Sequence, residues 1–477
     1  MADEFGEMVR DHFDSGRFFA ELSHKIAVPT EVSHLGINLA LTAYLERVLA
    51  PELGELGFVH EVHPDWRGSG NSFLIARRME DPAAPTVLCY GHGDVVNGMA
   101  GQWENGRDPW RLSDEDGRWY GRGSADNKGQ HQVNLSAVRL LLERRGSLGF
   151  NLIFLFEGGE EIGSPALDEF VREHREELRA DVMIGSDGPR VDARTPTLFL
   201  GNRGAYTFRL TADLRADALH SGNWGGVLRN AATTVTGAVE SIVDGQGRLL
   251  VPGLQTPQQS PETMLALSSL RFTPDPEDPE PDLAWFDPRL DLAERVWGSN
   301  VLEVLALQAG DADDPVNAIP GQATAVLQLR YLAGSARAEF PAILRQWLDD
   351  HGYGMVEVSE INDFPASRTE VSDPWVGWAV QVMREAIGKD IAVLPNIGGS
   401  LPNKVFAETL GLPTLWVPHS YPGCRQHAPD EHFLESIGRE GLLLMCALFD
   451  GLGHSGRHPA PISLASSVRT SSRSHQA

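Results

Sequence analysis

The chain is poor in cysteine. Only Cys89, Cys424 and Cys446 occur among its 477 residues, and no two of them form a Cys-x-x-Cys pair. Such an odd and sparse set argues against a disulfide framework and against a zinc site built from thiolates. Any metal that the chain binds must therefore be held by histidine and carboxylate ligands.

Long apolar runs are absent as well. No stretch reaches the roughly 18 consecutive apolar residues of a membrane helix. Residues 1–14 are acidic and lack the apolar segment of a signal peptide. Because 42% of the residues are hydrophobic and 22% charged, the composition is that of an ordinary globular protein. We expect no membrane association and a cytoplasmic location.

Basic residues are outnumbered. The sequence has 40 lysines and arginines against 66 acidic residues, a formal net charge of −26. A surface of this sign repels phosphate backbones, so a nucleic acid is not an expected partner. The length allows two or three domains.

The two ends of the chain alternate between helical and strand patterns. Short apolar strands are predicted over 86–90, 151–156, 181–184 and 414–417, and amphipathic helices over 39–49, 127–144, 375–386 and 436–449. This alternation predicts an α/β domain with a largely parallel sheet and helices on both faces.

The middle of the chain has a different pattern. Strands are predicted over 205–214, 323–332 and 356–361, helices over 227–243 and 338–349, and an irregular Pro- and acid-rich excursion over 256–288. These elements indicate a smaller α+β domain. We therefore predict a catalytic domain formed by residues 1–203 and 367–455, an inserted domain over 204–366, and a disordered tail over 456–477.

Histidines and carboxylates cluster where strands end or helices begin. A hydrolytic two-metal site needs histidine nitrogens, a carboxylate that touches two ions about 3.5–4 Å apart, and a free carboxylate as general base. In open α/β sheets, ligands bind at the carboxyl ends of the strands. The candidates at such places are His92, Asp94, Asp126, Glu160, Glu161 and Asp187, with His427 in a loop before the last helix.

Each of these segments has an ordinary interpretation when it is taken alone. A His-x-Asp pair usually lies on the surface, a Glu-Glu doublet usually begins a helix, and an aspartate after a strand usually belongs to a turn or a helix cap. Gly121-x-Gly123 does not predict a dinucleotide loop, because Asp126 stands where the third glycine would be. The five segments, residues 91–94, 121–129, 157–163, 185–187 and 425–431, together favour one shared site.

These five segments, in this order, resemble those of the dinuclear zinc hydrolases that include carnosinase-like dipeptidases, glutamate carboxypeptidase, aminoacylase and succinyl-diaminopimelate desuccinylase. The resemblance covers roughly Ala20 to Gly453. It implies two divalent ions per chain, with zinc expected and manganese or cobalt as alternatives. The implied ligands are His92 and Asp187 for one ion, Glu161 and His427 for the other, and Asp126 for both. Asp94 would orient His92, and Glu160 would be the general base for the attacking water.

The resemblance extends to the inserted domain. It implies that His220 polarises the scissile carbonyl, that Asn317 and Arg330 hold the oxyanion and the substrate carboxylate, and that the loop with Gly399 and Ser400 contacts this carboxylate. Without the resemblance, His220 would be an ordinary loop histidine and Arg330 a strand arginine paired with an acid. Because the lid domain of the family commonly dimerises, we expect a homodimer in which His220 and Asn317 act in trans.

The expected activity is hydrolysis of an amide bond in a small peptide. Asp187 and the segment 398–402 resemble the dipeptidase branch of the family, which favours a dipeptidase- or carboxypeptidase-type peptidase. An N-acyl-amino-acid amidohydrolase with the same centre is the alternative. A catalytically inactive relative that acts as a binding protein is a third possibility, against which the complete ligand set argues.

Some residues near the motifs are assigned no catalytic role. We expect His419 and His432 to be structural, with a place in the pocket wall as the alternative for His419. Trp66, Trp103 and Trp110 are expected to be either core aromatics or walls of an apolar substrate pocket. One departure from the family's pattern is that Asp430 stands before Glu431, where asparagine is common.

Overall fold

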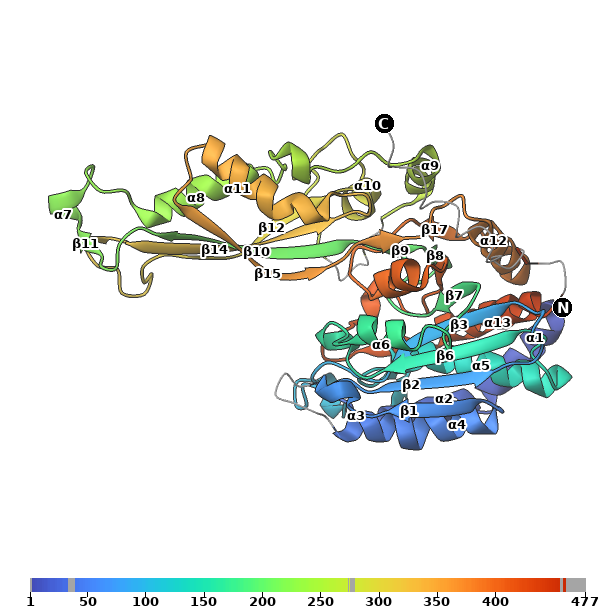
Figure 1. The fold of residues 1–477 in the computed structure, drawn as a ribbon. Coiled ribbons are helices and arrows are strands. Elements are labelled where there is room, and N and C mark those ends of the chain that lie inside the picture. Colours follow the sequence, from blue (N-terminus) through green and yellow to red (C-terminus); the bar gives the residue numbers. More distant parts are fainter. Residues whose placement is uncertain (1, 33–38, 273, 275–278, 455–457, 460–477) are drawn as a thin grey trace. The chain divides into compact units, whose positions relative to one another are not determined.

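A computed structural model describes residues 2–32, 39–272, 274, 279–454 and 458–459 (Figure 1). The chain forms two compact units. The first contains Met1–Pro196, Ser372–Ile391 and Thr409–Ala477, and the second contains Thr197–Val371 and Ala392–Glu408. The second unit therefore begins earlier than the predicted inserted domain and also takes in residues 392–408. Except for residues 458 and 459, the predicted tail lies outside the described residues. No described helix is both long and apolar enough to cross a membrane.

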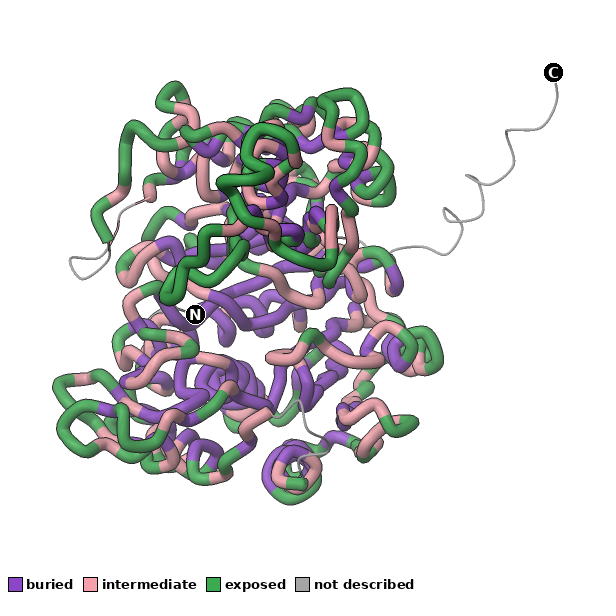
Figure 2. The backbone as a smooth tube through the Cα atoms, turned by 90° about the vertical axis from the view of Figure 1, so that its left-hand side faces the viewer, coloured by how far each residue is buried: buried purple, intermediate pink, exposed green. Residues whose placement is uncertain are grey.

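The first unit is built on a twisted sheet whose strands follow the order β1-β2-β6-β3-β7-β18. The strands are β1 (Val59–His63), β2 (Phe73–Arg78), β3 (Thr86–His92), β6 (Asn151–Glu157), β7 (Val182–Gly185) and β18 (Thr414–Trp416). Pairing is parallel from β6 to β18 and antiparallel at β1 and β2. Strand β6 is buried over its whole length, and buried residues are coloured purple in Figure 2. Its continuous apolar run is typical of a strand that is covered on both faces.

Helices cover both faces of this sheet. On α5 (Lys128–Arg145), the ring of His131 contacts Phe156 of β6. On α6 (Leu167–Glu173), the ring of Phe170 stacks on that of Phe73 of β2, with 4.1 Å between the ring centroids. Phe73 is in register with Glu157, the neighbour of Phe156, and successive strand side chains point to opposite faces. The two helices therefore lie on opposite faces, which confirms the predicted α/β class.

The remaining elements of the first unit surround this layer. Helix α13 packs against α5 and α12. The further helices are α1 (Ala2–Asp14), α2 (Arg17–Ile26), α3 (Leu39–Tyr44), α4 (Ala50–Glu55), α12 (Pro374–Ile387) and α13 (Glu435–Leu452). A small antiparallel sheet contains β4 (Ser113–Glu115), β5 (Arg118–Tyr120) and β19 (His432–Leu434).

The second unit contains an antiparallel sheet with the strand order β12-β14-β10-β15. Its main elements are β10 (Gly204–Asp213), α8 (Ala231–Ile242), β12 (Val301–Gln308), β14 (Gln322–Tyr331), α11 (Phe340–Asp350) and β15 (Val356–Phe364). Tyr206, Phe208 and Leu210 alternate along β10 and join the core formed with α8 and α11. The helices therefore cover one face of this sheet.

Shorter elements complete the second unit. A parallel pair joins β8 to β17, and two short antiparallel ladders join β11 to β13 and β9 to β16. Their bounds, with those of the short helices, are β8 (Thr197–Phe199), β9 (Gly201–Asn202), β11 (Leu219–His220), α7 (Ser221–Trp224), α9 (Pro261–Ser269), α10 (Leu292–Trp297), β13 (Ala318–Ile319), β16 (Ser367–Arg368) and β17 (Ala392–Leu394).

Candidate metal centre

The parallel strands of the first unit end at one edge of the sheet, and the candidate ligands follow them. His92 is the last residue of β3, a short turn over Glu160–Ile162 follows β6, and Asp187 lies two residues after β7. Because the carboxyl ends of parallel strands share an edge, these side chains come together there. Asp126 and His427 reach the same place from loops, Asp126 just before α5 and His427 just before β19.

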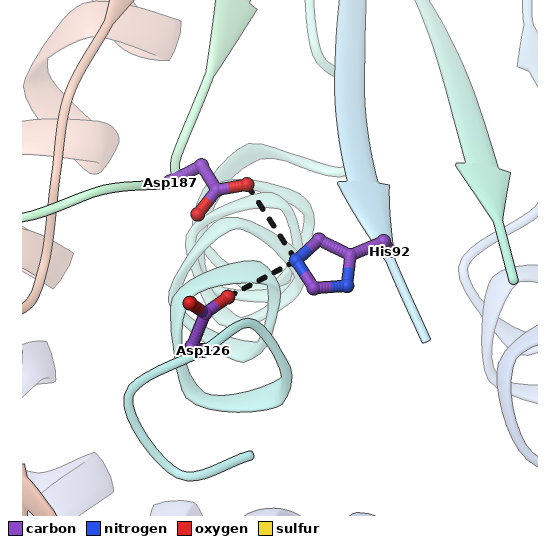
Figure 3. A group of neighbouring side chains, drawn as sticks. All are labelled: His92, Asp126 and Asp187. Atoms are coloured by element: carbon purple, nitrogen blue, oxygen red, sulfur yellow. Dashed lines mark hydrogen bonds and ion pairs between the residues drawn. The ribbon is translucent and has the colours of Figure 1, made fainter. Parts of the chain in front are cut away.

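One group of ligand atoms comes from His92, Asp126 and Asp187 (Figure 3). The Nε2 atom of His92 lies 3.1 Å from Oδ1 of Asp126 and 3.6 Å from Oδ2 of Asp187. The side chains of His92 and Asp187 are buried. The three potential ligand atoms lie within 4.8 Å of one another, as ligands of a single ion must.

A second group comes from Asp126, Glu161 and His427. The Nε2 atom of His427 lies 3.2 Å from Oδ2 of Asp126 and 3.1 Å from Oε2 of Glu161. Asp126 thus directs one oxygen to His92 and the other to His427. A carboxylate with its two oxygens in two ligand groups has the arrangement that a two-metal site requires.

Asp94 supports both His92 and the turn that follows β6. Its Oδ1 lies 3.3 Å from Nδ1 of His92, and its Oδ2 accepts a hydrogen bond of 2.9 Å from the backbone N–H of Glu161. The side chain of Asp94 is fully buried. A carboxylate behind the ring of a histidine ligand fixes the orientation of the ring and directs the other nitrogen toward the ion. Nδ1 of the same ring also lies 3.0 Å from the backbone carbonyl oxygen of Asp94, and the orienting role of the carboxylate stays a prediction.

The acidic groups of the centre are costly to ionise in the absence of a cation. Burial raises the pKa of Glu161 and of Asp187 to about 7, and the charge of Asp126 adds to the effect. Burial also raises the pKa of Glu160, with the charges of Asp187 and Glu161 adding to it and that of His92 opposing it. Glu160 lies next to Glu161 in the turn that follows β6, and its role as general base stays a prediction.

The histidines respond to the same charges in the opposite sense. Hydrogen bonds to Asp126 and then to Glu161 raise the pKa of His427 to about 11. Against the effect of burial, hydrogen bonds to Asp126 and Asp94 raise the pKa of His92. The centre thus favours positive charge, which a divalent cation supplies.

The donor set also fits a cation at the level of single atoms. Among the described residues, Oε1 of Glu161 and Oδ2 of Asp187 are buried and accept no hydrogen bond. Buried polar atoms without a partner are costly, and coordination to an ion would satisfy both oxygens. A mixed set of histidine nitrogens and carboxylate oxygens fits Zn²⁺, and also Mn²⁺ or Co²⁺.

Sequence reasoning missed two neighbours of these ligands. Gln426 donates a hydrogen bond of 3.2 Å to Oδ2 of Asp126, and Asn127 donates one of 2.9 Å to the carbonyl of Ser186. Each lies next to a predicted ligand, which is the only signal that the sequence carries for them. His419 and His432 have protein partners, Ser186 and Tyr421, in agreement with the structural role expected of both.

In the second unit, the short β11–β13 ladder brings His220 beside Asn317. His220 pairs with Ala318, and the backbone N–H of Ser221 donates to the carbonyl of Asn317 at 2.9 Å. Both side chains are exposed. Nδ1 of His220 accepts a hydrogen bond of 3.1 Å from the backbone N–H of Gly222, so in the neutral ring the proton lies on Nε2. His220 therefore presents an N–H donor at the surface of this unit.

Arg330 and Ser400 also come together in the second unit. Nη1 of Arg330 donates to Oγ of Ser400 at 3.1 Å, and this hydroxyl donates to the backbone carbonyl of Arg203 at 3.0 Å. Arg203, which sequence reasoning missed, is buried, and its Nε donates to the carbonyl of Gly398 at 3.1 Å.

The two arginines lie close enough for their charges to interact. Burial, with the charge of Arg330 adding to it, lowers the pKa of Arg203 to about 10. Two neighbouring guanidinium groups suit a carboxylate ligand. A Cβ atom added at Gly399 would meet only Ile397 within 4 Å, so the loop leaves space at this position.

The sequence profile of Peptidase family M20/M25/M40 matches residues 88–450. A cysteinylglycine-S-conjugate dipeptidase from Corynebacterium striatum is 30% identical over 74% of this chain and 76% of its own length. A beta-Ala-His dipeptidase from Rattus norvegicus is 27% identical over 80% of this chain and 81% of its own length. The crystal structure of human carnosine dipeptidase 1 has the same fold, with a TM-score of 0.71, 22% identity, and coverage of 95% of this chain and 100% of its own.

Proposed function

Since the chain belongs to the peptidase family M20/M25/M40 and is a metal-dependent hydrolase, we propose that it cleaves the peptide bond of dipeptides at a centre of two divalent ions. The observation that carries this proposal is the position of Asp126, which directs one oxygen to each of two ligand groups. His92 and Asp187 would complete one metal site, and Glu161 and His427 the other. Zinc is the expected ion.

The chemistry divides between the ions and the side chains. When bound, two divalent ions polarise the scissile carbonyl and lower the pKa of the attacking water. Glu160 takes a proton from this water and delivers it to the amine nitrogen that leaves. Asp94 keeps Nε2 of His92 directed at the centre through its contact with Nδ1 of the ring.

The residues of the second unit act on the substrate. His220 donates its Nε2 hydrogen to the carbonyl oxygen as negative charge develops there, and Asn317 assists it. Arg330 and Ser400 bind the free carboxylate of the dipeptide, beside the open position at Gly399. A second guanidinium, that of Arg203, strengthens the preference of this place for an anion. A substrate with a free C-terminal carboxylate follows from this arrangement.

We further propose a homodimer in which His220 and Asn317 serve the site of the partner subunit. The support for an interface is β12, an edge strand that pairs only with β14 among the described strands. Val304, Leu305 and Leu307 on it are 43%, 55% and 56% exposed. An exposed apolar edge strand favours pairing with another strand, and a second copy of the same edge satisfies it symmetrically. The cytoplasmic location stays a prediction.

A substrate panel tests the proposed reaction. The metal-loaded protein should hydrolyse dipeptides, including those for which the two relatives are named, with a kcat/KM at least about tenfold above that for N-acetylated amino acids. Release of free amine measures both reactions. Faster turnover of the N-acetylated compounds would instead support the amidohydrolase alternative. A protein that holds its metals and is inert on the whole panel would support the inactive, binding-only alternative.

A further inference from the structure

Glu431, four residues after His427, has a carboxylate that is saturated with hydrogen bonds. It is buried, with 1% of its surface exposed. It accepts hydrogen bonds at Oε1 from the backbone N–H groups of Ala125 (2.8 Å) and Asp126 (3.0 Å), and at Oε2 from the backbone N–H of Gly123 (3.1 Å) and Nη1 of Arg122 (2.6 Å). Three of the four donors are backbone groups of the loop that carries Asp126, so this side chain fixes the path of that loop.

The same residue belongs to the loop that carries His427. The antiparallel ladder between β5 and β19 pairs Tyr120 with His432, and one further backbone hydrogen bond of 3.0 Å runs from the N–H of Gly121 to the carbonyl of Glu431. The side chain of Glu431 continues this connection beyond the end of the ladder. It therefore couples a ligand loop that precedes α5 to one that lies some 300 positions later in the chain.

Asp430 holds the His427 loop from another side. Its Oδ1 accepts hydrogen bonds from the backbone N–H of Glu104 at 3.1 Å and from Nη1 of Arg107 at 2.7 Å. His427 and Asp430 have φ values of 64° and 63°, in the left-handed region that non-glycine residues seldom adopt. Such a backbone persists where its surroundings impose it, and the contacts of Asp430 and Glu431 do so here.

We infer that Glu431 is a positioning residue of the metal centre, which holds the bridging carboxylate of Asp126 and the loop of His427 in the geometry that both ions need. The inference rests on the proposed function, because it assumes the two ligand groups that share Asp126. Glu431 belongs to neither ligand group, and its side chain reaches them through its hydrogen bond with the backbone N–H of Asp126. Since that residue is shared, loss of the Glu431 carboxylate weakens both metal sites together.

A role in stability alone makes a different prediction, and the chain offers a matched control. Asp450 of α13 is also a buried carboxylate, 4% exposed, and its Oδ1 lies 3.2 Å and 3.0 Å from Nη1 of Arg144 and Nη1 of Arg145. These arginines end α5, whereas Asp126 precedes its start, and a helix of 18 residues is about 27 Å long. Asp450→Asn removes a buried, arginine-paired charge at the end of α5 away from the ligands.

The experiment is a titration of the metal-stripped full-length protein with Co²⁺. The dissociation constants come from chelator competition and the visible absorption of the bound ion, and the melting temperature of each metal-free variant is recorded alongside. Glu431→Gln keeps the shape of the side chain but places an amide where two donors point. It should raise the Kd for both ions at least about tenfold. Asp450→Asn should leave both Kd values within about twofold of wild type, even if its melting temperature falls as far as that of Glu431→Gln.

A second variant separates the positioning role of Glu431 from the cost of leaving the charge of Arg122 unpaired. Glu431→Gln leaves Arg122 buried without its carboxylate, which by itself destabilises a fold. The double variant Arg122→Met, Glu431→Gln removes that charge, and it should regain melting temperature without regaining metal affinity. Wild-type Co²⁺ affinity in either Glu431 variant, or equal losses of affinity in Glu431→Gln and Asp450→Asn, would overturn the inference. Wild-type protein that binds no Co²⁺ would overturn the proposed function itself.

Discussion

The two units present their candidate residues in opposite ways. In the first unit, the side chains of His92, Asp126 and Asp187 lie mostly buried and interact directly with one another. In the second unit, the side chains of His220 and Asn317 are exposed, and the contacts that bring the two residues together run through the backbone.

The difference reflects what each unit has to supply. An ion needs several ligand atoms close to one another, so the fold of the first unit has to bring these side chains together. A group that meets a substrate must instead be accessible. Substitutions in the first unit should therefore change metal content, whereas those in the second should change kcat or KM and leave the metals in place.

The largest effect is expected for Asp126→Ala. Because this carboxylate belongs to both ligand groups, its loss should remove both ions or nearly so, and activity should fall by more than about a thousandfold. Elemental analysis after dialysis and turnover of a dipeptide measure the two quantities. Asp114→Ala, at an exposed position on β4, is the control and should keep both. Retention of two ions by Asp126→Ala would contradict the bridging role.

The next effect separates chemistry from metal binding within the Glu160–Glu161 doublet. Glu160→Gln should keep both ions while kcat falls about 10²- to 10⁴-fold, because the attacking water loses its base. Glu161→Gln should instead lower metal occupancy, since Oε2 of Glu161 belongs to the second ligand group. Steady-state kinetics and elemental analysis on both variants provide the comparison. The reverse pattern would show that the two roles are exchanged.

The sequence predicts most strands of both sheets, but it misses β1 and β2 in the first unit and β12 in the second. Strands β3 and β6 and helix α5 lie within two residues of their predicted bounds, because a buried strand or helix leaves a continuous apolar or periodic pattern. Strand β12 was not predicted. Most of its side chains are exposed, and a bulge between Val304 and Ala306 interrupts its alternation. Because its alternation is interrupted, β12 carries no regular pattern that predicts a strand.

The same distinction applies to the site. Four of the five proposed ligands follow a strand or precede a helix, which made them candidates, and the resemblance of their segments to the zinc hydrolases implied their roles. Other contributions to the site come from contacts between segments far apart in sequence, namely those of Arg203, Gln426 and Glu431. Nothing local marks an arginine whose partner is a backbone carbonyl nearly two hundred residues away. Such contacts become visible only once the chain is folded.

A smaller loss, confined to kcat, is expected in the second unit. His220→Ala should keep both ions and lose about 10²- to 10³-fold in kcat, as for removal of one donor to a developing oxyanion. The proposed dimer can then be tested by complementation. Mixed dimers of Glu160→Gln and His220→Ala chains contain one site with both wild-type groups and should recover activity under subunit exchange. Mixtures that stay inactive, or an active enzyme that sediments as a monomer, would contradict action in trans.

The smallest effect is expected at Arg330, and it should be confined to substrate binding. Arg330→Met removes a guanidinium that already donates to Ser400, so it should raise KM for dipeptides about 10- to 100-fold, the range for a lost hydrogen bond to a charged group. The change should leave metal content intact and kcat nearly so, because the substrate carboxylate lies away from the bond that is cleaved. A dipeptide with an amidated C-terminus is the matched probe, since its KM should hardly differ between wild type and variant. A variant with unchanged KM and reduced kcat would place Arg330 at the reacting carbonyl instead. The second unit would then use Arg330 in the chemical step and not to bind the substrate carboxylate.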